Sequence, residues 1–209
     1  MGNRAVITTK ENFKKNGIGI YVHWNGGRDS VEAFLRYCEL KGYVSPEKCN
    51  YGFARLTQVI SNLFGGHDSI GIDLLSNLDC DNRDNGVYII EDWKIVDRKY
   101  FTNKREQRNY NLDEMLLLID SKMPEDEQIK EYIEAKEVST INLKPGDTIV
   151  DVNHDGKCYY SVVIGFIYKT NPDDTVERIP YTNRYGDDYI NNRINHITTK
   201  TVRIIKKEV

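Results

Sequence analysis

Apolar residues first alternate and then take a helical spacing across one stretch near the start of the chain. Residues 18–22 place isoleucine or valine at every second position, which predicts a half-buried β-strand. Residues 31–38 place apolar side chains on one face of a helix, and the period changes across the Asn-Gly-Gly of residues 25–27. Asp29 and Glu32 have the spacing of a capping box, which predicts that the helix starts at Asp29.

The pattern up to residue 138 predicts an α+β domain, with a mixed or antiparallel sheet and segregated helices. Residues 70–74 and 87–90 are apolar runs around a polar loop that ends in Asn-Gly, so we expect them to form a hairpin. The other elements expected in this domain are strands near residues 5–8 and 93–100, and helices near residues 46–64, 111–119 and 124–136.

The pattern changes from about residue 140 to short apolar runs that are separated by turn residues. Pro-Gly-Asp at residues 145–147, Asn-His-Asp-Gly at residues 153–156 and Asn-Pro-Asp-Asp at residues 171–174 mark the turns. Residues 201–207 are expected to form a last strand. Residues 139–209 are therefore predicted to be a small all-β, barrel-like C-terminal module.

The composition indicates a globular protein, because charged residues make up 29% of the 209 residues and hydrophobic residues 39%. A net charge of −3 provides no positive field for phosphate backbones, so we do not expect a nucleic-acid partner. No apolar run approaches the roughly 20 residues of a membrane span. With no signal-peptide pattern, this predicts a cytoplasmic protein that does not enter a membrane.

Metal and cofactor chemistry receives little support from the sequence. The four cysteines form no C-x-x-C pair, which favours free thiols over a zinc site. The acidic loop with Asp79, Asp81 and Asp84 departs from the calcium-loop template, because an arginine and an aspartate stand at its fifth and sixth positions. We therefore expect neither a metal nor a cofactor.

The strongest candidate site is the turn between the first predicted strand–helix pair, with His23, Asn25, Gly26, Gly27 and Arg28 as ligand-facing residues. Glycines let a ligand approach the backbone, a helix N-terminus offers N–H groups, and an arginine can bind an anion with two donors. Phosphate or carboxylate groups suit such a place. The alternative is that the glycines only form the turn and that an acidic residue caps the helix.

The start of the chain and this turn resemble an uncharacterised protein family associated with bacteriophages and prophages. The resemblance covers about residues 1–65 and is carried by Gly2, Arg4, His23, Trp24 and Gly26. The chain differs at Asn25 and Gly27, where the family pattern usually has an acid and an aromatic residue. The resemblance implies a small cytoplasmic protein of a mobile element and implies no activity.

A second resemblance is to papain-like cell-wall amidases, in which a cysteine opens a helix and a Pro-Gly-Asp turn leads into histidine-bearing strands. Cys49 stands just before the apolar face of the second predicted helix, and residues 145–147 supply the turn. Ser161 stands about where the strand histidine is expected, which leaves His154 or His196 as the base. The resemblance implies a cysteine hydrolase that uses Cys49.

Together these observations favour a non-enzymatic binding protein of a phage or mobile element that acts on a host component. It would either capture a small anionic ligand such as a nucleotide or cover a host protein. A papain-like hydrolase and a structural or assembly protein stay open as alternatives, and so does self-association.

Overall fold

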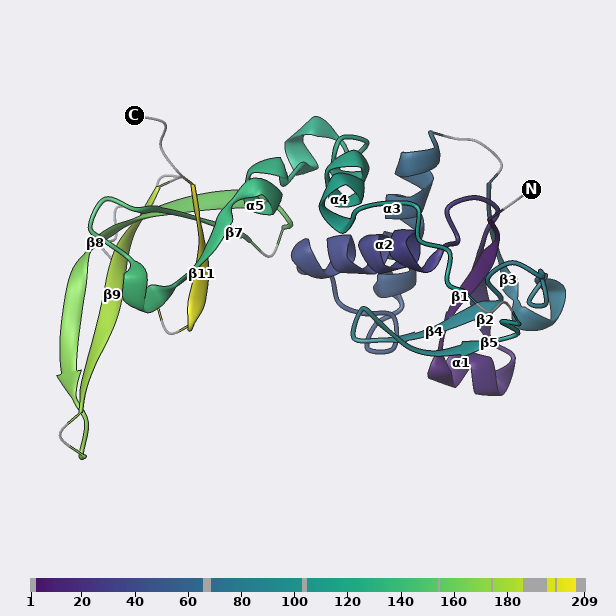
Figure 1. The fold of residues 1–209 in the computed structure, drawn as a ribbon, viewed down its shortest axis with the longest axis horizontal. Coiled ribbons are helices and arrows are strands. Elements are labelled where there is room, and N and C mark those ends of the chain that lie inside the picture. The colour runs from purple at the N-terminus through teal and green to yellow at the C-terminus, as the bar shows by residue number, and fades with distance from the viewer. Residues whose placement is uncertain are drawn as a thin grey trace. The chain divides into compact units, whose positions relative to one another are not determined.

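The computed structural model describes residues 3–65, 69–102, 105–153, 155–173, 175–185, 195–197 and 199–205. The chain divides into two compact units, Met1–Gln128 and Ile129–Val209 (Figure 1). The predicted boundary after residue 138 falls inside strand β6 (Lys136–Ser139), which pairs with strand β11 (Thr201–Ile205) of the second unit. The predicted fold class is confirmed: helices and a mixed sheet form the first unit, and a curled antiparallel sheet forms the second.

The first unit contains one five-stranded sheet in the order β3-β2-β1-β4-β5. Its strands are β1 (Ala5–Thr9), β2 (Ile18–Val22), β3 (Ile70–Leu74), β4 (Val87–Glu91) and β5 (Lys94–Lys99). Its helices are α1 (Lys10–Lys15), α2 (Arg28–Leu40), α3 (Tyr51–Phe64) and α4 (Leu112–Asp120), with short 3₁₀ turns η1 (Leu75–Asn77) and η2 (Glu125–Glu127).

The pairing of β3 and β4 differs from the prediction. The predicted hairpin of residues 70–74 and 87–90 is wrong, because β3 pairs with β2 and β4 pairs in parallel with β1. Local alternation and turn residues identify a strand, but they do not identify its neighbour in the sheet. The segment between β3 and β4 therefore crosses from one edge of the sheet to the far side of the central strand.

Helices α2, α3 and α4 lie together beside the sheet (Figure 1). Their fully buried side chains include Phe34, Leu56, Ile60, Met115 and Ile119, and the central strands also bury their apolar side chains. The opposite face carries a smaller cluster formed by Val6, Leu75 and Val87. Two helices differ from the prediction: α3 starts at Tyr51 rather than near residue 46, and residues 124–136 hold only η2 and a short α5 (Lys130–Glu134).

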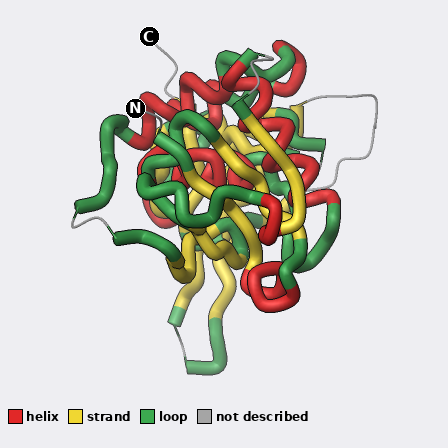
Figure 2. The backbone as a smooth tube through the Cα atoms, turned by 90° about the vertical axis from the view of Figure 1, so that its right-hand side faces the viewer, coloured by secondary structure: helices red, strands yellow, loops and turns green. Residues whose placement is uncertain are grey.

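The second unit contains a six-stranded sheet in the order β10-β9-β8-β7-β11-β6. Its further elements are η3 (Thr140–Asn142), β7 (Thr148–Val152), β8 (Cys158–Thr170), β9 (Val176–Tyr185), β10 (Asn195–His196) and β11 (Thr201–Ile205). Its core cluster consists of Leu143, Ile149 and Val163. The long hairpin of β8 and β9 projects from this core (Figure 1), and Figure 2 shows it ending in a short loop.

Candidate functional site

The predicted site is a tight turn between β2 and α2. The chain leaves β2 through His23 and takes a left-handed conformation at Asn25, with φ of 54°. Gly27 is the N-cap of α2 and the helix begins at Arg28. The predicted capping box is therefore wrong, because Asp29 lies inside the first turn and does not cap the helix.

Both glycines of the turn lie against other parts of the chain. A Cβ at Gly26 would meet the backbone of Arg4 and Ala5 at 2.7 Å, and the Gly26 N–H donates to the Asn3 carbonyl at 2.7 Å. A Cβ at Gly27 would lie 3.0 Å from the Gln107 carbonyl. The space that these glycines leave is therefore occupied by the chain itself. The start of β1 lies against Gly26, and the loop of residues 105–110 lies against Gly27.

Arg28 is held by two carboxylates. Its Nε donates to Glu32 Oε1 at 2.7 Å, and one terminal nitrogen lies 3.5 Å from Glu106 Oε1. Glu106 also binds Arg98, and Glu32 accepts from Arg108 at 3.1 Å. Two acids thus bridge three arginines around the first turn of α2. An external anion at Arg28 would compete with Glu32 and Glu106 for its donors.

Asp29 fixes the loop that covers the helix N-terminus. Its carboxylate is 6% exposed and accepts from the backbone N–H groups of Ser30 at 2.8 Å and Tyr110 at 2.7 Å, and also from that of Asn109. An ionised acceptor is suited to several buried N–H donors. We call Arg28, Asp29, Glu32, Arg98 and Glu106 the α2 cluster.

Sequence reasoning did not assign Arg98 and Asn85 to this site, although they organise the far side of the cluster. Arg98 donates to the Asn85 carbonyl at 2.8 Å and to its side-chain oxygen at 2.9 Å, and stacks on Phe101 at 3.6 Å and Tyr88 at 4.3 Å. Burial raises the pKa of Tyr88 above its ordinary value. The Tyr88 hydroxyl is buried and has no hydrogen-bond partner among the described residues.

His23 packs between two aromatic side chains. Its ring lies 4.6 Å from that of Trp24 in an edge-on arrangement, and its Nδ1 lies 3.4 Å from the Tyr21 hydroxyl. Its backbone N–H donates to the Ser69 carbonyl. The structure thus places the five predicted residues in one turn, while Arg28 and the glycines are engaged by the chain. The prediction that they face a ligand stays a prediction.

The residues of the papain-like alternative lie in different units. Cys49 is half-buried in the first unit, in the turn before α3, with its sulfur 3.6 Å from Asn50 Oδ1. His154 lies outside the described residues, and of His196, in the second unit, only the backbone is described, paired with Tyr181. The Pro-Gly-Asp motif forms a turn before β7, in which Asp147 accepts from the Lys144 N–H.

The acidic loop before β4 binds a cation of the chain itself. Asp84 accepts from Arg4 Nε at 2.7 Å, and Asp79 lies 3.5 Å from another Arg4 nitrogen. Within the part of the chain that the structure describes, no group of three or more histidine, cysteine or acidic side chains has metal-site geometry. None of the helices described here combines the length and apolarity that crossing a bilayer requires.

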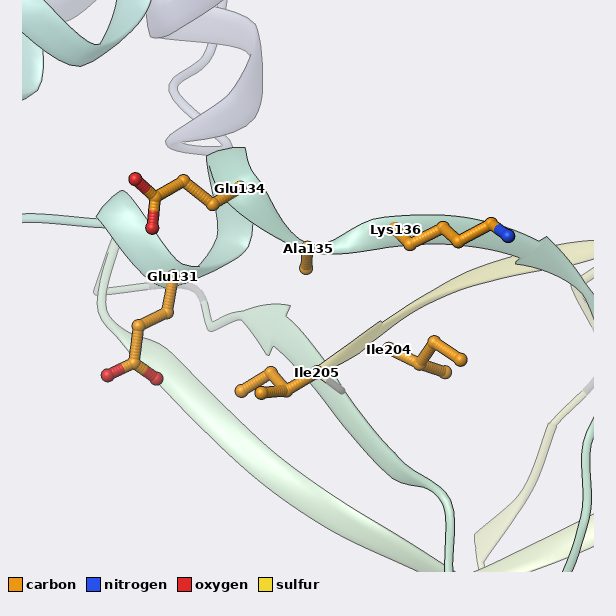
Figure 3. Close-up of a pocket in the computed structure, with 6 residues that line it drawn as sticks. All are labelled: Glu131, Glu134, Ala135, Lys136, Ile204 and Ile205. Carbon is orange, nitrogen blue, oxygen red and sulfur yellow. The ribbon is translucent and has the colours of Figure 1, made fainter. Parts of the chain in front are cut away.

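Each unit has a surface pocket. The pocket of the second unit has a volume of about 400 Å³ and lies between α5, the start of β6 and the end of β11 (Figure 3). In Figure 3, Ala135 faces Ile204 and Ile205, while Glu131, Glu134 and Lys136 extend away from them. The pocket of the first unit, about 550 Å³, lies between α3 and the β2–β3 pair and has no charged side chain in its lining.

The β8–β9 hairpin carries apolar side chains beyond the core of its unit. Phe166 packs against the core, and alternation places Tyr168 and its neighbour Val176 on the same face of the hairpin. Tyr168 is 67% exposed and Val176 is 62% exposed. Arg178 covers the Phe166 ring at 3.4 Å and donates to the Ile141 carbonyl at 2.7 Å. We call Phe166, Tyr168, Val176 and Arg178 the hairpin strip.

The chain was compared with protein families, curated proteins and solved structures. Neither a family model, nor a curated protein, nor a solved structure matches the chain significantly.

Proposed function

We propose that this chain is a non-enzymatic binding protein that covers a surface of another protein with its β8–β9 hairpin. The observation that carries the proposal is the hairpin strip, in which two large side chains stay more than half exposed on the face that continues from the core. Apolar side chains grouped at an exposed position mark interaction sites more often than single ones do. Tyrosine and arginine are also enriched where protein interfaces bind most tightly.

The chemistry of the strip favours a protein partner over a small anion. Its surface is apolar and aromatic, and its one cation, Arg178, already donates to the Ile141 and Leu143 carbonyls. In the first unit, Arg28 is bound by carboxylates. A partner with an apolar groove or an exposed strand edge would bury Tyr168 and Val176 without displacing an existing ion pair.

The resemblance to a phage and prophage family supports a partner from the host of a mobile element. Cys38, Cys49 and Cys80 are free thiols, which suits the cytoplasm as the place of action. The alternative of an assembly protein would use the same strip against a structural partner.

The test is capture of the partner with and without the strip. A photo-crosslinking amino acid at position 168 in the full chain is expected to join one host protein in defined stoichiometry. The Tyr168→Ser, Val176→Ser double variant is expected to lose capture by an affinity-tagged chain, because both side chains contact solvent and contribute little to the core.

Tyr51→Ser is the matched control, since Tyr51 is 73% exposed and lies in the other unit. It should retain the partner, and circular dichroism should show that all variants fold. Equal capture by the double variant, or equal loss in Tyr51→Ser, would contradict the proposal.

A further inference from the structure

The two edges of the first unit's sheet differ in how they are protected. β5 has charges at four of its six positions, and its ladder with β4 is irregular at Ile89 and Ile90. Charged residues and irregular pairing are common devices against edge-to-edge association. β3, at the other edge, has the sequence Ile-Gly-Ile-Asp-Leu with a regular register along β2. In the described part of the chain no strand pairs with its outer side.

The face of β3 that should be buried is half exposed. Ile72 lies opposite Ile20 and Leu74 lies opposite Ile18, so the alternating apolar residues point to the side that α3 covers. Yet Ile72 is 54% exposed and Leu74 is 45% exposed. With Phe53 of α3, Ile72 borders the uncharged pocket of about 550 Å³. The apolar face therefore continues to the open edge of the sheet.

The backbone of β3 presents alternate residues to this edge. Leu75 donates to the Gly17 carbonyl, and the Ser69 carbonyl accepts from His23, so the odd-numbered residues of the strand bond to β2. Because antiparallel bonds alternate, the N–H and C=O groups of Ile70, Ile72 and Leu74 point outward. The strand edge is thus a row of regularly spaced donors and acceptors.

We propose that the outer edge of β3 pairs with β3 of a second copy of this chain, in antiparallel register centred on Ile72. In this register Ile72 faces Ile72 and Ile70 faces Leu74, so every outward N–H meets an outward C=O. Two five-stranded sheets join into one, with both α3 helices on the same face. The proposal does not depend on the function assigned to the hairpin strip.

The side chains of β3 fit their own copies in this register. Apolar residues face apolar residues on the helix side, and on the other side Asp73 faces Gly71, so no like charges are directly opposed. In a single copy the Leu74 N–H donates to Asp73 Oδ1 at 2.7 Å, and pairing exchanges this bond for one to Ile70. Stable interfaces bury about 1,200–2,000 Å². A five-residue strand pair is short, so the dimer should depend on concentration.

The first experiment measures the mass of the full chain by light scattering after size exclusion over a concentration series. The native chain is expected to approach twice its monomer mass. Ile72→Lys places two ammonium groups opposite each other and is expected to weaken dimerisation by about tenfold or more.

The matched control is Val96→Lys in β5, where the side chain is 49% exposed, close to the 54% of Ile72. It is expected to dimerise like the native chain. A mixture of Ile72→Lys and Ile72→Glu is expected to form a mixed dimer, because the two opposed charges now attract. Rescue of this kind does not follow from misfolding or general aggregation.

Hydrogen exchange of the native chain tests the register without a substitution. The Ile70 and Ile72 amides are expected to become protected as concentration rises, whereas the Gly71 and Asp73 amides are protected throughout by β2. A native chain that stays monomeric at every concentration overturns the proposal. A dimer that Ile72→Lys leaves intact, or concentration-independent exchange at Ile72, overturns it as well.

Discussion

The α2 cluster and the hairpin strip use their side chains in opposite ways. In the α2 cluster, Arg28 is bound by Glu32 and Glu106, and the Asp29 carboxylate accepts backbone N–H groups. In the hairpin strip, Tyr168 and Val176 contact mainly solvent. The residues with the most suggestive chemistry in the sequence hold the first unit together. The residues available to a partner are ordinary strand residues in an exposed position.

The largest expected effect follows from Asp29→Ala. It removes a buried acceptor and leaves the backbone N–H groups of Ser30, Asn109 and Tyr110 without this partner. An unpaired buried donor costs about 1–3 kcal/mol, which applies in full to Ser30 and only in part to the part-buried bonds of Asn109 and Tyr110. We expect a loss of about 2–4 kcal/mol in the free energy of unfolding, measured by urea denaturation. Tyr168→Ser in the hairpin strip is expected to change it by less than about 0.5 kcal/mol. Similar losses of unfolding free energy in both variants would contradict the contrast between the α2 cluster and the hairpin strip.

Two buried tyrosines allow a comparison between a hydroxyl that is hydrogen-bonded and one that has no hydrogen-bond partner among the described residues. The Tyr37 hydroxyl donates to Asp120 Oδ1 at 2.7 Å, and both residues are buried. Tyr37→Phe is expected to lower the free energy of unfolding by about 1.5–3 kcal/mol, the range for hydrogen bonds to charged groups. Tyr88→Phe removes an unpartnered buried hydroxyl and is expected to be neutral or stabilising. Parallel urea titrations compare them, and a clear loss in Tyr88→Phe would show that its hydroxyl is engaged.

Alkaline pH is expected to lower the stability of the folded chain through the same two tyrosines. Burial, and for Tyr37 also the hydrogen bond to Asp120, raises the pKa of Tyr37 and Tyr88 above the ordinary value. The unfolded chain releases these protons near pH 10 while the folded chain retains them, so stability is complete below about pH 10 and falls above it. The slope is at most about 1.4 kcal/mol per pH unit for each group. Urea midpoints across this range measure it, and Tyr37→Phe should reduce the slope. A slope unchanged in that variant would contradict this.

The smallest expected change in stability comes from Glu106→Ala, about 1 kcal/mol or less, because the ion pairs of Glu106 are partly exposed. The variant removes the acid that bridges Arg28 and Arg98. Phosphate or nucleotides are then expected to raise the thermal midpoint of Glu106→Ala and to leave that of the native chain unchanged.

Glu39→Ala is the control for this prediction, since Glu39 forms an exposed ion pair with Arg36 elsewhere on α2. It should respond like the native chain. A shift in the native chain itself would show that the turn binds anions as it stands.

Local elements of this fold could be predicted where short-range signals agree. The strand of residues 18–22, the following helix and the helix capped by Asn111 each combine a period with a turn or cap residue. The partner of β4 could not be predicted, because its parallel neighbour β1 lies about 80 positions earlier and no turn joins them.

Prediction of the candidate site was limited for the same reason, because residues that are distant in the sequence contact the turn. The sequence locates the turn of His23–Arg28 correctly, but it does not show that Asn3, Glu106 and Gln107 approach it from both sides. Tyr168 and Val176 alternate as core residues do, so periodicity gives no sign of their exposure. Exposure depends on how far the hairpin extends beyond its core, which only the assembled sheet defines.

The order of strands also has a consequence for synthesis on the ribosome. β1 emerges before the other strands of its sheet and is the central strand, so one side of it pairs early with β2 while the other side stays unpaired until β4 is made. Until residue 91 has left the exit tunnel, a buried, apolar strand keeps an open edge. Contacts between distant segments slow folding and expose nascent chains to aggregation. Translation speed over residues 23–86 should therefore set how long the nascent chain needs protection by chaperones.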